Sequence, residues 1–182
     1  MNKSELRQAL KSRRNNMTSE EVIEKSNKIC DKVIFSDYFK NAGTVMVYLS
    51  FKNEVNTRKI IEKAISSDKK VLVPITDGDD MFVSLIDDLN SLKKGAFGID
   101  EPTVIKEWSG KIDLCIIPGL GFDKWGGRIG FGKGYYDKFL LKNPCIKMGI
   151  AYSNQIEENV FSEPHDIPMD IIVTEEEMFF VE

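Results

Sequence analysis

Two spacings of apolar residues alternate along the chain. At positions 6, 9 and 10, and then at 22, 23, 29, 30, 33 and 34, apolar residues recur with the three-to-four spacing of a helix. This pattern predicts helices over 3–16 and from 19 to about 36, the second introduced by a capping box between Thr18 and Glu21. Two more helices are expected, one capped at Asn56 or Thr57 and running to about 65, the other over 135–141.

Between these helical stretches lie short runs that are almost continuously apolar and rich in β-branched residues. Such runs are typical of strands buried on both faces. The six expected strands are 44–49, 70–75, 81–86, 112–117, 146–151 and, as the last strand, 171–174. Residues 89–102 show only a weak pattern and are interpreted as a connection. Strands that alternate with helices in this way predict one α/β domain, 1–182, whose sheet has helices on both faces.

Composition and charge narrow the classes of protein. The 182 residues are 42% apolar and 30% charged, which is typical of a globular chain. With 25 basic and 29 acidic residues the net charge is −4, which argues against binding to nucleic acid. No apolar run approaches the ~20 residues of a membrane span, and no secretory signal is visible at the start. Three cysteines without Cys-x-x-Cys spacing favour a reducing compartment, so a cytoplasmic location is expected.

The most distinctive segment is PGLGFDKWGGRIGFGKGYYD at 118–137, which holds seven of the 13 glycines. It follows a predicted strand and precedes a helix, so its backbone N–H groups are placed to bind an anion, with Arg128 and Lys133 adding positive charge. The segment nearly matches a P-loop, but Gly134 replaces the Ser or Thr that would hold Mg²⁺. Phosphate binding is therefore inferred without a P-loop, and Asp137 is the nearest metal ligand. The alternative is that the glycines only form turns.

Four other features have both a plain and a functional interpretation. Lys3, Arg7 and Arg14, with Lys11 beside them, share one helix face, which is either solvated or directed at a nucleotide. Glu54, just past the first strand, is either a surface residue or an acceptor for an amino-heterocycle.

The other two features lie near the end of the chain. His165 is the only histidine, which excludes a multi-histidine metal centre and leaves an ordinary loop residue or a catalytic one. Asp170, just before the last predicted strand, is either an ordinary strand-edge acid or a second metal ligand beside Asp137.

Several blocks together resemble one family. The segments 118–123 and 127–137 resemble the signature of 5-formyltetrahydrofolate cyclo-ligases, also called 5,10-methenyltetrahydrofolate synthetases. Residues 3–7 are similar to the family's Lys-x-x-Leu-Arg element, residues 48–57 to its first-strand segment, and residues 165–174 to its C-terminal segment. The blocks follow the family order over nearly the whole chain. Ile129 and Gly121, where Leu and Ala are more common in the family, alter no polar role.

The resemblance implies a single-domain, three-layer α/β/α sandwich with a Rossmann-like open sheet, and a cytoplasmic, monomeric enzyme. It also implies ATP- and Mg²⁺-dependent closure of 5-formyltetrahydrofolate to 5,10-methenyltetrahydrofolate, with release of ADP and phosphate. In the family's chemistry the formyl oxygen takes the γ-phosphoryl group, N10 attacks the activated carbon, and phosphate leaves. Phosphorylation turns a poor leaving group into a good one, and it needs alignment and charge neutralisation more than a strong base.

The resemblance also assigns roles to residues. Catalysis falls to Arg128, Lys133 and Tyr135. ATP binding falls to Lys3, Ser4, Glu5, Leu6 and Arg7, and to Arg128, Ile129, Gly130, Phe131, Gly132, Lys133, Gly134, Tyr135 and Tyr136. Folate binding falls to Leu49 and Glu54 with Phe131, Gly132, Lys133, Gly134 and Tyr135. Asp137 and Asp170 are implied to hold Mg²⁺.

Three other functions stay open on the residues alone. One is an ATP-dependent kinase or ligase that acts on another small molecule through the same loop. Another is a non-catalytic nucleotide or folate sensor. The third is an RNA-binding strand at 128–136, which the many glycines and the negative net charge disfavour.

Overall fold

The computed structural model describes all 182 residues, and its helices follow the predicted spacing. The α-helices are α1 (Lys3–Asn15), α2 (Ser19–Phe35), α3 (Asp37–Asn41), α4 (Arg58–Ser66) and α5 (Tyr135–Lys142), and the 3₁₀ helices are η1 (Leu89–Ser91), η2 (Ala96–Gly98) and η3 (Ser153–Gln155). The predicted capping box is confirmed, because the N–H of Glu21 donates to Thr18 Oγ1 at 3.2 Å and that of Thr18 to Glu21 Oε2 at 2.8 Å. No helix is both long and apolar enough to cross a membrane.

The main sheet has seven strands. Their order is β12 (Met178–Phe180), β11 (Ile171–Val173), β9 (Ile146–Ile150), β6 (Leu114–Ile117), β1 (Thr44–Val47), β2 (Lys70–Asp77) and β3 (Asp80–Ile86). The five inner strands pair in parallel, whereas β3 and β12 at the edges are antiparallel. The small sheets are β10 (Ile156–Glu157) with β7 (Gly121–Asp123) and β8 (Arg128–Ile129), and β4 (Leu92–Lys94) with β5 (Asp100–Pro102).

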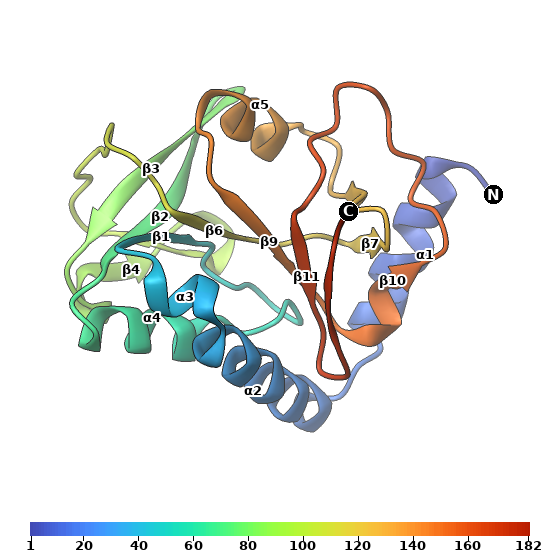
Figure 1. Ribbon diagram of the computed structural model, residues 1–182, viewed down its shortest axis with the longest axis horizontal. Helices are drawn as coiled ribbons and strands as arrows, with labels where there is room; N and C mark the ends of the chain where they lie inside the picture. Colours follow the sequence, from blue (N-terminus) through green and yellow to red (C-terminus); the bar gives the residue numbers. More distant parts are fainter.

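Helices cover both faces of this sheet, as the sequence predicts. Helices α2, α3 and α4 lie along one face and α5 lies over the other, while α1 stands at one end of the sheet beside β7 and β10 (Figure 1). Two core clusters fill the two interfaces. In β1, Val45 and Val47 belong to the cluster under α2–α4 and Met46 to the other, because successive strand side chains point to opposite faces. Burial on both faces explains why this run reads as continuously apolar.

The order of the strands positions the functional residues. From β1 the chain moves outward through β2 and β3, then returns to place β6 on the other side of β1. The connections that leave the carboxyl ends of β1 and β6 therefore diverge. In open α/β sheets such a topological switch point forms a crevice in which ligands bind.

The structure corrects several predicted elements. Helix α3 and the pairing of β4 with β5 were not expected, because both are too short to show a clear period. Strand β11 is not the last, since β12 follows it, and β7 and β8 lie inside the glycine-rich segment. Thr57 does not cap α4 with its side chain: its hydroxyl donates to the carbonyl of Tyr48 at 2.7 Å, while the Arg58 N–H donates to Asn56 Oδ1 at 3.0 Å.

Candidate active site

A cavity of about 890 Å³ occupies the crevice between the ends of β1 and β6. It is bounded by α1, the loop after β1, the glycine-rich segment, the first turns of α5 and the loop around His165. Most residues that the resemblance assigned to ATP, folate and metal line this one cavity. They are Lys3, Ser4, Arg7, Glu54, Arg128, Gly130, Phe131, Gly132, Lys133, Gly134, Tyr135, Tyr136 and Asp137.

Five of the assigned residues do not line the cavity, and four of them support its walls. Leu6 and Ile129 are buried in a small cluster that joins α1 to the glycine-rich segment. Leu49 packs against the main core, and Glu5 closes a capping box with Asn2 at the start of α1. The cluster that contains Leu6 and Ile129 fixes the position of α1, from which Lys3 and Arg7 reach the cavity.

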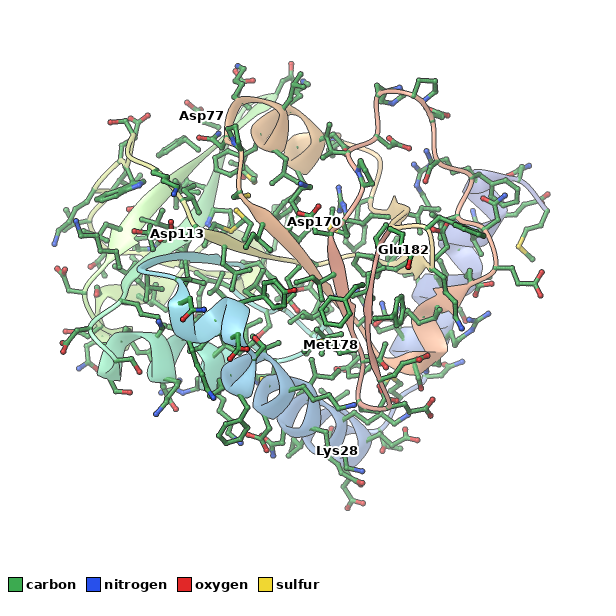
Figure 2. The ribbon with its side chains drawn as sticks, viewed as in Figure 1. Lys28, Asp77, Asp113, Asp170, Met178 and Glu182 are labelled. Atoms are coloured by element: carbon green, nitrogen blue, oxygen red, sulfur yellow. The ribbon has the colours of Figure 1, made fainter.

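The fifth is Asp170, which lies at the amino end of β11, beside β9 (Figure 2). Its Oδ2 accepts from the N–H of Lys147 at 2.8 Å and lies 2.9 Å from the Lys147 ammonium. Asp137, in contrast, lines the cavity, and its Oδ1 accepts from the N–H of Ile167 at 2.9 Å. The structure thus places one of the two predicted metal ligands in the cavity and pairs the other with a lysine.

The glycine-rich segment presents free backbone donors to the cavity. Its first half is anchored by Asp123, whose carboxylate accepts from the N–H groups of Trp125, Gly127 and Val160 at 2.9–3.0 Å. Beyond β8, the N–H groups of residues 131–134 donate to no protein acceptor. Gly132 and Gly134 have φ of +95° and +70°, which is left-handed backbone that glycine adopts readily. Unsatisfied N–H groups beside a cavity make it suited to an anion.

The cations of the site are held in different ways. Lys133 is exposed and forms no ion pair, and Arg7 Nε donates to the carbonyl of Gly130 at 3.0 Å. Lys3 Nζ contacts Asp166 Oδ2 at 3.0 Å. Arg128 is 9% exposed, donates to the carbonyl of Pro118 at 3.1 Å and lies 3.7 Å from Asp137 Oδ2. Burial lowers the pKa of Arg128 and Asp137 opposes the shift, but a guanidinium stays protonated in proteins.

Two other predicted residues line the cavity, one from the loop after β1 and one from the first turn of α5. Glu54, on the loop after β1, accepts from the N–H of Phe51 at 3.0 Å through Oε2, and its other oxygen has no protein partner. Burial raises the pKa of Glu54, and the Phe51 N–H and Arg14 partly oppose the rise. The hydroxyl of Tyr135 donates to the carbonyl of Gly78 at 2.8 Å, so the first turn of α5 is tied to the turn between β2 and β3.

Sequence reasoning missed part of the lining. Glu163, His165 and Asp166 carry ligand atoms that lie within 4.8 Å of one another, and the two carboxylates lie 3.8 and 3.0 Å from the ammonium of Lys3. Burial raises the pKa of Asp166, but the Glu163 N–H and Lys3 outweigh it and the net shift is downward. The sequence did contain a signal for this part of the site, because residues 165–174 resemble the C-terminal segment of the family. The remaining lining residues were not assigned: Asn2, Arg14, Pro118, Gly119, Lys138 and Leu141.

The fold and the cavity define an open α/β protein with a cationic, glycine-rich site at a topological switch point, a place where such proteins bind phosphorylated ligands. Comparisons with known proteins identify the family within this class. The sequence model of the 5-formyltetrahydrofolate cyclo-ligase family matches residues 1–175.

Individual relatives agree over nearly the full length. A probable 5-formyltetrahydrofolate cyclo-ligase of Caenorhabditis elegans is 31% identical over 96% of this chain and 93% of its own. The solved 5,10-methenyltetrahydrofolate synthetase of Aquifex aeolicus superposes with a TM-score of 0.89 at 33% identity, covering 100% of this chain and 93% of the other. The Mycoplasma pneumoniae synthetase gives 0.78 at 26% identity, with 96% and 99% coverage. The chain belongs to the 5-formyltetrahydrofolate cyclo-ligase family of enzymes.

Proposed function

We propose that this enzyme closes the ring of 5-formyltetrahydrofolate in an ATP- and Mg²⁺-dependent reaction that releases 5,10-methenyltetrahydrofolate, ADP and phosphate. One observation carries the proposal. A single cavity joins a loop of free N–H groups and an unpaired lysine to a carboxylate with one free oxygen. The N–H groups and the lysine suit a triphosphate, and the carboxylate suits the amino edge of a pterin. The two substrates can therefore meet within this cavity.

The triphosphate would lie along the glycine-rich loop. The N–H groups of residues 131–134 would donate to its oxygens, and Lys3 and Arg7 would approach from α1. In this position Lys133, free of ion pairs, neutralises charge on the transferring phosphoryl group. Arg128 is fixed by Pro118 and stacks 5.1 Å from the ring of Tyr136, so it is pre-oriented for the same task.

The folate would lie toward β1. The free oxygen of Glu54 and its partner Oε2 would accept from the amino group and the ring N–H of the pterin. Leu49 would shape this end of the cavity from beneath, where it packs on the core. Phe131, which is 60% exposed, would lie where the folate and the nucleotide meet. Tyr135 would stand near the reacting formyl group.

The chemistry then needs alignment rather than a strong base. The formyl oxygen attacks the γ-phosphorus of ATP and ADP departs, after which N10 attacks the activated carbon and phosphate leaves. Residues Lys133 and Arg128 stabilise the charge on the phosphoryl oxygens in the first step.

The residues present fit a Mg²⁺ ion held mainly by ATP. This ion usually takes one or two carboxylates together with phosphate oxygens and water, and Asp137 is a carboxylate that lines the cavity. Asp137 would hold the ion, whereas Asp170, the second ligand that the resemblance implies, lies outside the cavity and contacts Lys147. When bound, the ion would neutralise charge on the phosphates.

The first test is turnover. Purified protein is mixed with 5-formyltetrahydrofolate, ATP and Mg²⁺, and product is followed by the absorbance of 5,10-methenyltetrahydrofolate. We expect product only in the complete mixture, and none when ATP is omitted or a chelator is in excess. Absence of product from the complete mixture, with ATP binding still detected by calorimetry, would contradict the proposal and favour another acceptor or a sensor.

A further inference from the structure

Arg14, in the last turn of α1, is a buried cation without a hydrogen-bonding or ionic partner. Its residue is 6% exposed, and its side chain forms no hydrogen bond and no ion pair within 4.0 Å. The Nε atom is fully buried and unsatisfied, yet the residue lines the cavity. A buried charge without a partner is unfavourable by roughly several kcal/mol even after relaxation, about the scale of a whole domain's net stability. A guanidinium held in this way is expected to have a partner that arrives with a ligand.

The surrounding contacts hold this cation next to Glu54. The side-chain amide of Asn53 donates to the carbonyls of Arg14, Asn15 and Met17 at 3.0, 3.4 and 3.2 Å, which ties the end of α1 to the loop after β1. Glu54 is the next residue on that loop. The guanidinium carbon of Arg14 also lies 5.9 Å from the centre of the Phe131 ring, so three separate segments meet around it.

Although their charges are opposite, Arg14 and Glu54 do not pair. No atoms of the two groups lie within the 4.0 Å of a salt bridge, although Arg14 is near enough to lower the pKa of Glu54. Direct pairing would satisfy both groups, so their separation within one cavity leaves room for something that bonds to both. That ligand must donate to a carboxylate at one point and accept from a guanidinium at a neighbouring point.

We propose, on the basis of the function proposed above, that Arg14 is a substrate-binding residue that donates to the ring carbonyl oxygen of the folate's oxo-pteridine while Glu54 accepts from the adjacent amino and ring N–H groups. The edge of this ring carries two donors and one acceptor in a row, which matches a carboxylate followed by a guanidinium. Arg14 lies too deep for the flexible glutamate tail, whose carboxylates are strongly hydrated and suit an outer, exposed cation.

The variant Arg14→Met keeps the length of the side chain and removes its donors. We expect KM for 5-formyltetrahydrofolate to rise about 10- to 100-fold, as for loss of a charged donor to a buried acceptor, and KM for ATP to stay within about twofold. Arg13→Met is the matched control, because Arg13 is on the same turn but points to Glu157 at 2.7 Å outside the cavity. It should leave both KM values unchanged.

A shortened substrate decides which part of the folate Arg14 contacts. With 5-formyltetrahydropteroate, which lacks the glutamate, the Arg14→Met defect should persist in full. If the defect disappears with this substrate, the residue binds the tail and the proposal is overturned. Thermal unfolding gives a second readout: a purely structural arginine would lower Tm on substitution, whereas removal of an unsatisfied buried charge should leave Tm equal or higher.

Direct binding separates this inference from the proposed reaction. Calorimetry with 5-formyltetrahydrofolate alone needs no turnover. If the wild type binds the folate but forms no product, only the reaction is refuted, and at least tenfold weaker binding by Arg14→Met still supports the role of Arg14. Equal binding by the wild type and the variant overturns that role whether or not product forms, and a wild type that binds no folate overturns both proposals.

Discussion

The sheet has a cavity at each end, and the two differ in how their charged groups are satisfied. The cavity of about 620 Å³ at the amino ends of β1, β6 and β9 is lined by Asp113, Lys111 and Tyr38, among others. There Asp113 accepts from the N–H groups of Gly43 and Thr44, both at 2.9 Å, and lies 3.5 Å from the ammonium of Lys111. Figure 2 shows Asp113 at this end of the sheet.

In the cavity at the carboxyl end of the sheet, several polar groups lack a protein partner. Arg14 has no hydrogen bond or ion pair, Lys133 has no ion pair, Glu54 has a free oxygen, and the backbone N–H groups of 131–134 have no protein acceptor. Both cavities are large enough for a small molecule, so volume does not separate them. The two cavities differ in the polar groups without a protein partner, which gather at the carboxyl end: the side-chain nitrogens Arg14 Nε and Arg128 Nε are buried there without a partner, whereas the N–H groups of 131–133 and Lys133 are exposed and open to a ligand.

The largest expected effect comes from Lys133→Ala. Loss of one donor that stabilises the transferring phosphoryl group should raise the activation barrier by about 2–4 kcal/mol. Steady-state measurement of kcat/KM checks it. Lys111→Ala, in the other cavity, is the control and should leave kcat/KM unchanged. A similar loss in both variants would show that the contrast between the two cavities has no functional meaning.

The next effect is on folate binding. Glu54→Gln replaces an acceptor by an amide that also presents donors to the pterin edge, and it should weaken folate binding by about 1.5–3 kcal/mol while ATP affinity stays the same. Separate calorimetric titrations with each substrate measure this, with Asp113→Asn as the control carboxylate. An equal loss of ATP affinity would mean that Glu54 has been assigned the wrong role.

A smaller effect is expected for the metal. Asp137→Asn should raise the Mg²⁺ concentration needed for half-maximal rate by about tenfold, because one of the few protein ligands of the ion becomes neutral. We expect a smaller shift from Asp170→Asn, since that carboxylate already contacts Lys147. Rates are measured against free Mg²⁺ at fixed ATP. No shift from Asp137→Asn would leave ATP and water as the ligands of the ion.

The smallest effect concerns stability at the other end of the sheet. The N–H groups of Thr44 and Gly43 lower the pKa of Asp113, even though its partial burial raises it. Because the pKa is lower in the folded state, the stabilisation is present above the unfolded value of about 3.9 and is lost as the pH falls through the folded value.

Asp113→Asn should therefore reduce the free energy of unfolding by about 1 kcal/mol at neutral pH, a value discounted for solvent screening, and the difference should narrow in acid. Denaturant titrations of the two proteins at pH 7 and in acid measure it. A difference that is independent of pH would show that the charge of Asp113 is irrelevant to the contact.

Much of the fold was predictable because local patterns carry it. The strand runs such as 44–47 are apolar on both faces, and the helices show caps and stripes, so α/β architecture with helices on both faces follows from sequence. Helix α3 and strands β7, β8 and β12 were not predictable, because two to five residues hold too little periodic signal and pair through distant partners. The single domain and the monomeric state stay predictions.

For the site, the sequence by itself determined the chemistry of the glycine-rich segment and, through the resemblance, the family. The tertiary structure alone decided which charges remain available. Glu54 and Lys133 line the same cavity because the switch point brings the loops after β1 and β6 together. In the sequence Arg14 is one of several cations on a helix face that could be solvated, but in the structure it is buried. Its neighbour Arg13 forms an ion pair with Glu157 instead. Burial and hydrogen bonding depend on contacts more than a hundred residues away, such as that of Arg7 with Gly130, and no local spacing encodes them.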